Sequence, residues 1–172
     1  MPLGVVVRKS PGVTRWAKWV WRAVAVLPGA GPADGRVVAR LGDAVETHAA
    51  TVTLTLYRSE TEAYRDALSA AVPSVYVVMR DDGQGPEVML ATASPYEAQD
   101  YLDSGEEIVE AIAMPPGLIA WVRDFTDAHH VDEPFKKRRR DRVRIDEKQD
   151  GKGDPRIAGD IYRAPKTSKA GS

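Results

Sequence analysis

The sequence predicts an α+β fold: a mainly antiparallel sheet of about six or seven strands with three helices, followed by a disordered C-terminal tail. Three observations predict it. Short β-branched segments follow one another near the N-terminus without a helix between them, which favours a meander over βαβ units. Three later segments have helix start and stop signals. Aromatic and aliphatic residues become rare after residue 135, so we place a globular domain at 1–135 and the tail at 136–172.

The first part of the chain is expected to form strands. Residues 3–7 are apolar, β-branched and bounded by prolines, as in a short strand. Residues 16–27 contain three tryptophans and then alternate alanine with valine. We predict a strand in the second half of this segment, and a helix over residues 16–26 stays the alternative, because alanine and tryptophan discriminate poorly between the two. Residues 36–41 and 46–58 follow, and the second run alternates threonines with apolar residues, as half-buried antiparallel strands do.

A capping box predicts the start of the first helix. The Ser59 hydroxyl and the Glu62 carboxylate have the spacing at which each bonds a free backbone amide of the first turn. The apolar face of this helix extends to Ala71, and Pro73 ends it. Further strands are expected at 74–79 and 88–93, joined as a hairpin, and at 107–114.

Proline marks the start of the other two helices. Ser94 is the expected N-cap of the second helix, Pro95 its first residue, Glu97 the partner in its capping box and Gly105 its stop. The third helix begins at residues 115–116 and ends near residues 129–130. Its apolar stripe consists of Leu118, Ile119, Trp121, Val122 and Phe125.

The composition restricts the chemistry and hides a charge asymmetry. The net charge is −1, but residues 1–135 hold 11 Lys and Arg against 19 Asp and Glu (−8), and residues 136–172 hold 13 against 6 (+7). The chain has no cysteine, which excludes disulfides, thiolate zinc sites, cysteine-ligated iron–sulfur clusters and a cysteine nucleophile. Neither a secretory leader nor an apolar run of about 20 residues is recognisable, so we expect a soluble cytoplasmic protein without a membrane span.

No pattern in the sequence predicts an active site. His129 and His130 resemble metal ligands, but adjacent side chains on a helix point about 100° apart, and histidines near a helix C-terminus suit its dipole. Ser94 lacks the glycines of a nucleophile elbow and is explained by capping. The glycines at 29, 31 and 35 lack the spacing of a phosphate-binding loop. We therefore expect no catalytic residue, metal or cofactor.

Two groups of side chains are candidates for binding a partner protein. The carboxylates Glu97, Asp100, Asp103, Glu106, Glu107 and Glu110 are expected to form a mostly solvated acidic face around the second helix, with Tyr96 and Tyr101 beside it. Imperfect alternation puts Trp19 and Trp21 on one strand face with Ala23 and Ala25. Core filling is the favoured interpretation of these tryptophans, and some of their surface becomes a partner anchor if the N-terminal strand lies at a sheet edge.

A basic run supports an alternative function. It consists of Lys136, Lys137, Arg138, Arg139, Arg140, Arg142 and Arg144. Such a run contacts phosphates and gives salt-dependent nucleic-acid or anionic-lipid binding. No aromatic residue is interleaved for base stacking, so nucleic acid is the less favoured partner. The charge is equally compatible with a segment that folds back on the protein's own acidic face, or that holds an acidic partner.

Several segments resemble a family of small proteobacterial proteins of unknown function. The similar segments are residues 2–7 (PLGVVV), 19–22 (WVWR), 26–28 (VLP), 60–65 (ETEAYR), 73–78 (PSVYVV), 92–101 (TASPYEAQDY), 104–107 (SGEE) and 129–135 (HHVDEPF), and the resemblance covers about residues 2–138. Genes of that family tend to lie beside genes for molybdopterin-dependent, formate-dehydrogenase-like oxidoreductases and their maturation chaperones. The resemblance implies a context and transfers no catalytic residue.

From the residues and this resemblance together we expect a non-catalytic accessory protein, assembly factor or small subunit. Its partner is then a molybdopterin oxidoreductase subunit or a maturation factor of that enzyme, bound through protein–protein contacts. Two alternatives stay open: nucleic-acid or regulatory binding through residues 136–144, and an enzyme of unrecognised type, which needs a cleft with convergent polar groups.

Overall fold

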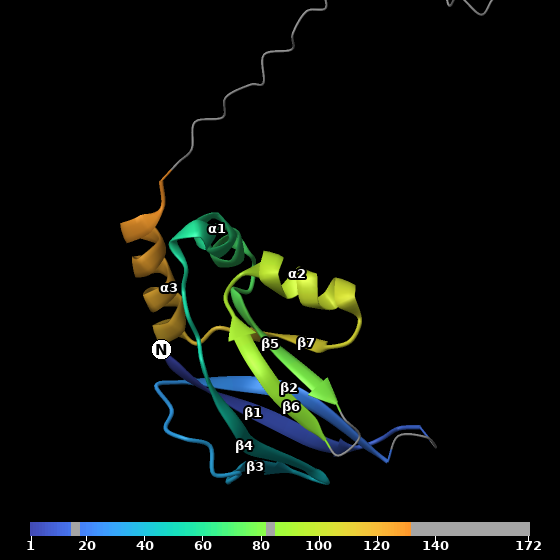
Figure 1. The fold of residues 1–172 in the computed structure, drawn as a ribbon. Coiled ribbons are helices and arrows are strands. Elements are labelled where there is room, and N and C mark those ends of the chain that lie inside the picture. Colours follow the sequence, from blue (N-terminus) through green and yellow to red (C-terminus); the bar gives the residue numbers. More distant parts are fainter. Residues whose placement is uncertain (15–17, 82–84, 132–172) are drawn as a thin grey trace, which may run out of the picture. The chain divides into compact units, whose positions relative to one another are not determined.

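Seven strands and three α-helices form in residues 1–14, 18–81 and 85–131, the part of the chain that the computed structural model describes (Figure 1). The strands are β1 (Pro2–Pro11), β2 (Trp19–Pro28), β3 (Val37–Leu41), β4 (Ala44–Thr53), β5 (Ser74–Asp81), β6 (Pro86–Thr92) and β7 (Ile108–Ala113). The helices are α1 (Thr61–Ser69), α2 (Pro95–Ser104) and α3 (Pro116–His129), and a 3-10 turn, η1 (Arg58–Glu60), precedes α1. The α+β class, the strand number and the helix number agree with the prediction. The predicted tail, residues 136–172, lies outside the described residues.

The seven strands are divided between two antiparallel sheets. The first has the order β2-β1-β4-β3 and the second the order β6-β5-β7. In Figure 1 the three-stranded sheet lies between the four-stranded sheet and the helices α1 and α2. The helix α3 stands beside α1, close to the N-terminus. Two sheets form because each has one apolar face, and stacking the two faces removes both from water.

Alternating residues of both sheets form the shared core. They include Leu3, Val5 and Val7 of β1 and Val75, Val77 and Met79 of β5. Tyr64 of α1 and Leu118 and Val122 of α3 join the same cluster. Val78, on the other face of β5, is also buried, and α2 packs over that sheet. Each such aliphatic side chain contributes about 1.5–3 kcal/mol by leaving water.

A β-bulge explains the imperfect alternation of the tryptophan strand. Val6 pairs with Ala25 and Val7 with Ala23, so Val24 is an extra residue in β2. The bulge changes the phase of the strand, and Ala23 and Val26 are therefore both buried. The predicted strand is confirmed. The helical alternative is wrong for its described residues, because residues 19–26 pair along their length with β1.

The first helix begins differently from the prediction. Ser59 lies inside η1, and the N-cap of α1 is Glu60, whose side chain makes no capping hydrogen bond. The predicted capping box is wrong because Ser59 is already within a helical turn, whereas a capping residue needs extended backbone. The helix also ends at Ser69, so Ala71 lies beyond it and is exposed. Burial of Ala63, Tyr64 and Ala67 holds α1 in place instead.

The second and third helices begin and end as predicted. The Ser94 hydroxyl accepts a hydrogen bond from the Glu97 amide (3.3 Å), and Gly105 ends α2 with a left-handed backbone (φ 70°). The Ser94 amide donates to the Thr92 hydroxyl (3.1 Å), which takes the place of the Glu97 carboxylate in the expected box. α3 begins at Pro116 and ends at His129.

The connection from β2 to β3 packs on part of the outer face of the four-stranded sheet. This loop crosses β1 at Gly4, where an added Cβ would lie 2.7 Å from His48 Nε2 and 2.8 Å from the Ala30 Cβ. Thr51 on β4 fixes the loop by donating from its hydroxyl to the Gly31 carbonyl (2.7 Å). Gly4 is therefore required by the close approach of the loop.

Candidate protein-binding surface

Two tryptophans and a lysine lie together where β1 and β2 extend toward their hairpin. Trp21 pairs with Lys9 across the strands, and Trp19 pairs with Pro11. Lys9 Nζ lies 4.4 Å from the centroid of the Trp19 ring and 4.9 Å from that of Trp21. An ammonium group at this distance is attracted by the ring face, by about 0.5–1 kcal/mol at an exposed site. The Lys9 ammonium therefore attracts both indole rings.

These side chains continue the face of the sheet that forms the core. Val5 and Val7 are buried on that face, and Lys9 and Pro11 follow in the same alternation. Lys9 is half-buried and Pro11 exposed, so burial decreases along β1 toward this end. Trp21 packs against the core, but Trp19 is 42% exposed. The favoured interpretation of core filling thus fits Trp21 better than Trp19.

A cleft of about 310 Å³ opens beside Trp21, between the four-stranded sheet and the start of β6. Its floor comes from β1, β2 and β4, and its wall from the first residues of β6. The residues that line it are Val7, Trp21, Thr47, Ala49, Gly85, Pro86 and Glu87. Most of these are apolar, and Thr47 and Glu87 are its polar members. We call these seven residues, with Lys9 and Trp19, the tryptophan cleft.

Backbone irregularities shape the tryptophan cleft. Ala49 is the extra residue of a second bulge, since Val5 pairs with Ala50 and Val6 with His48. Gly85 has a backbone conformation that side chains rarely adopt (φ 132°), and a Cβ there would contact the Trp21 ring at 3.4 Å. Glycine at position 85 therefore allows the backbone at this residue to approach the indole closely.

Sequence reasoning found the two tryptophans of this surface and missed its other members. Lys9 had a signal, since it lies two residues after Val7 and therefore on the same strand face. Thr47, Ala49 and Glu87 had none, because their position depends on strand register and on the packing of one sheet against the other. The strand that carries the tryptophans, β2, is the outermost strand of its sheet, whereas the first strand, β1, lies between β2 and β4.

The second predicted surface lies on α2 and is more closely tied to its neighbours than expected. The Tyr96 hydroxyl donates to Asp66 of α1, and this hydrogen bond raises the pKa of Tyr96. Asp100 is exposed, whereas Glu97 and Tyr101 are half-buried. Tyr96, Glu97, Asp100 and Tyr101 all lie on α2, and none of them lines the tryptophan cleft.

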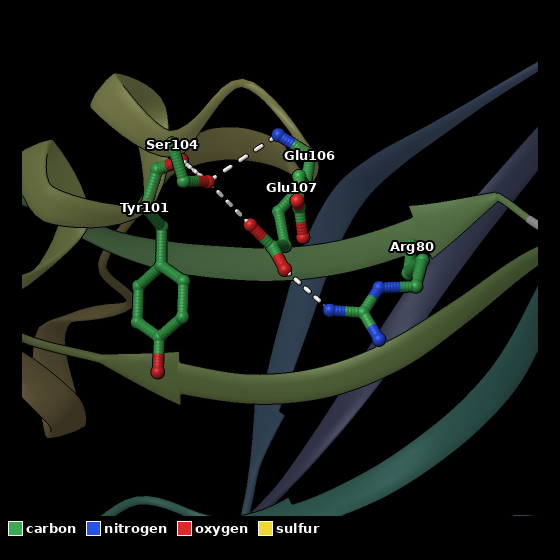
Figure 2. Close-up of polar contacts among 5 residues, drawn as sticks. All are labelled: Arg80, Tyr101, Ser104, Glu106 and Glu107. Atoms are coloured by element: carbon green, nitrogen blue, oxygen red, sulfur yellow. Dashed lines mark hydrogen bonds and ion pairs between the residues drawn. The ribbon is translucent and has the colours of Figure 1, made fainter.

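Glu107 belongs to an internal hydrogen-bond network, as Figure 2 shows. Its side chain is only 8% exposed and accepts from Arg80 (2.5 Å). The second carboxylate oxygen lies 2.6 Å from the Ser104 hydroxyl, which donates to it. The Ser104 hydrogen bond and then the Arg80 guanidinium hold the pKa of Glu107 below its ordinary value. This carboxylate ties the end of α2 to β5, whereas Glu106 beside it is exposed.

The predicted acidic face is therefore divided. Asp100 and Asp103 are exposed on α2, and Glu107 is paired within the chain. Glu110 pairs with Val77 in the sheet, so it lies on the face that points toward the core and away from α2. Glu107 and Glu110 are thus separated from the exposed carboxylates of α2.

The two histidines at the end of α3 face different neighbours. The His129 ring packs edge-on against Phe125, with centroids 4.6 Å apart. The His130 ring lies between Arg65, 2.6 Å from its Nε2, and Thr61, 3.0 Å from its Nδ1. Because arginine only donates, Nε2 accepts and Nδ1 carries the proton in this arrangement. His130 therefore ties the end of α3 to α1, whereas His129 contacts its own helix. Residues 1–14, 18–81 and 85–131 contain no group of three potential metal ligands.

Two further predictions concern the basic run and the absence of a membrane span. The basic run from Lys136 to Arg144 lies outside the described residues. Within the described residues, no helix is both long enough and apolar enough to span a bilayer.

Comparison with known proteins gives one match. A family model described as "Protein of unknown function (DUF3305)" matches residues 2–139, most of the chain. Searches of curated proteins and of solved structures gave no match.

Proposed function

We propose that this chain, which belongs to the DUF3305 family, is a non-catalytic accessory protein that binds another protein through the tryptophan cleft. The proposed partner is a subunit of a molybdopterin-dependent, formate-dehydrogenase-like oxidoreductase, or a maturation factor of that enzyme. The chain then serves either as a small subunit or as an assembly factor.

One observation carries the binding proposal. The core-forming face of the four-stranded sheet continues past the second sheet and presents Trp19, Trp21 and Lys9 at its edge. Tryptophan is enriched among the residues that dominate protein interfaces, because it buries a large rigid surface and keeps a polar N–H group. The adjoining cleft provides a pocket for a side chain of the partner.

The choice of partner is supported by the sequence resemblance. Family genes tend to lie beside genes for molybdopterin oxidoreductases and their chaperones, and such enzymes need helpers for cofactor insertion and subunit contact. The cysteine-free sequence fits a helper that carries no iron–sulfur cluster.

The test is purification of the full-length tagged chain from its native host at native abundance, with mass spectrometry of the proteins recovered. We expect an oxidoreductase subunit or maturation factor with the wild type, and its loss in Trp19→Ser. Val38→Ser on β3 is the matched control, because Val38 is similarly exposed on the opposite edge strand. Recovery of the chain alone, or of the same partner with Trp19→Ser, would contradict the proposal.

A further inference from the structure

We infer that the tryptophan cleft binds a protein segment that carries an aromatic or aliphatic side chain next to a carboxylate. The side chain packs against Trp21 in the cleft, and the carboxylate pairs with Lys9. This inference rests on the proposed function, because it names the chemistry that the partner has to present.

The size and lining of the cleft indicate the apolar part of the ligand. Val7, Trp21, Ala49 and Pro86 surround a space of about 310 Å³. This volume is at the lower end of ligand pockets, which span roughly 300–1,000 Å³. It accommodates one or two side chains of a segment, and the indole favours an aromatic or branched aliphatic group by stacking and area burial.

The charge of Lys9 indicates the polar part. Its neighbour Arg8 is paired with Glu46 at 2.6 Å, on the other face of the strand. Lys9 forms no ion pair within residues 1–14, 18–81 and 85–131, where its ammonium rests on two indole rings. A cation above a ring face keeps N–H donors directed away from the ring, and a carboxylate is the partner that matches them in charge.

Lys9 is the charge that orients the ligand. A bound segment places its acidic residue toward Lys9, and a segment with a basic residue in that position is disfavoured. Glu87 adds no second charge inside the cleft, because it pairs with Arg80 and its side chain lies on the same face of that sheet as Arg80.

Four ten-residue peptides with one glycine–serine background test this inference. Their central pairs are Phe-Asp, Phe-Asn, Ala-Asp and Phe-Lys, and each is titrated into the full-length chain while the indole N–H signals are followed by NMR. Trp19→Phe and Trp21→Phe assign the signals. We expect Phe-Asp to shift the Trp19 and Trp21 signals and to bind about threefold more tightly than Phe-Asn, the effect of one partly exposed ion pair. Ala-Asp and Phe-Lys bind more weakly still.

Variants of the lysine show whether the acid preference comes from this residue. Lys9→Gln should bind Phe-Asp and Phe-Asn equally, Lys9→Arg should keep the preference, and Lys18→Gln, which changes an exposed neighbouring lysine, should behave as the wild type. Unfolding midpoints confirm that each variant is folded. No shift of the two indole signals with any peptide, or an acid preference that persists in Lys9→Gln, overturns the inference. If the native partner is lost in Trp19→Ser but retained in Lys9→Gln, the proposed function stands. The inference that the partner presents an acidic segment to Lys9 is then wrong.

Discussion

Individual residues in this chain have roles that depend on one or two neighbours. Glu107 lies in a run of carboxylates, yet its side chain is nearly buried and pairs with Arg80 and Ser104. Glu106, one residue earlier, is exposed. The difference arises because β7 begins directly after Glu107 and brings it beside β5. Sequence spacing places both carboxylates at the end of α2, and only the fold separates them.

The lowered pKa of Glu107 predicts an acid-sensitive contribution to stability. A carboxyl whose pKa is lower when folded stabilises the fold at pH values above its unfolded pKa, and this contribution disappears as the pH falls through the folded pKa. We therefore expect Glu107→Gln to lower the urea midpoint at pH 7. The difference from the wild type should shrink once the pH falls below the ordinary carboxyl value of 4.5. Urea unfolding followed by circular dichroism from pH 7 to pH 3 measures this.

Glu106→Gln is the matched control, because it removes a neighbouring carboxylate that has no such pair in the network of Figure 2. It should leave the pH dependence close to that of the wild type. A Glu107→Gln chain whose midpoint follows the wild type at every pH would show that the network contributes nothing.

Single elements show what local sequence does and does not determine. All start and stop signals of α2 act within about ten residues, and its bounds follow from Ser94, Pro95 and Gly105. The same type of signal at Ser59 is wrong, since a 3-10 turn already includes that residue. Packing of Tyr64, whose hydroxyl accepts from the Tyr57 amide (3.0 Å), determines where α1 lies. Local capping signals are therefore reliable only where the preceding backbone is extended.

Substitution of Ser94 and of Ser59 compares the starts of α2 and α1 directly. Ser94→Ala removes a capping hydrogen bond from a fully buried site, and we expect a loss of about 1 kcal/mol in the free energy of unfolding. Ser59→Ala removes no capping bond and should stay within about 0.5 kcal/mol of the wild type, as exposed substitutions do. Urea unfolding of both variants at pH 7 measures the two values. Equal losses would mean that Ser59 caps α1 in solution.

The strands show the same limit on prediction. The alternation in β4 and the apolar run of β5, which is buried on both faces, identify strands from sequence alone. The bulge at Val24 and the division into two sheets depend on pairing between distant segments, which periodicity does not reveal. The tryptophan cleft is built from three strands of one sheet and the start of another. Its tryptophans were predictable as candidates, and its shape was not.

The whole molecule combines two charged regions of opposite sign with different proposed partners. Residues 1–135 carry a net charge of −8 and include the tryptophan cleft, where one ammonium is offered to the ligand. Residues 136–172 carry a net charge of +7, and seven of their 13 lysines and arginines lie between Lys136 and Arg144. Protein binding through the cleft and nucleic-acid binding through the basic run therefore involve very different numbers of charges.

Salt dependence distinguishes these two modes of binding. Contacts between seven cations and duplex DNA release counterions, and the logarithm of the affinity would fall with a slope of about −6 against the logarithm of salt concentration. Binding through the cleft uses one charge, that of Lys9, beside the apolar contacts with the tryptophans. We therefore expect the partner's affinity to change only a few-fold between about 50 and 200 mM salt, whereas seven phosphate contacts would lose roughly 10³-fold or more over the same range. Replacing all five residues from Lys136 to Arg140 by glutamine in the full-length chain should leave partner binding unchanged. A steep slope for the partner, or its loss in this variant, would move the function from the tryptophan cleft to the basic run.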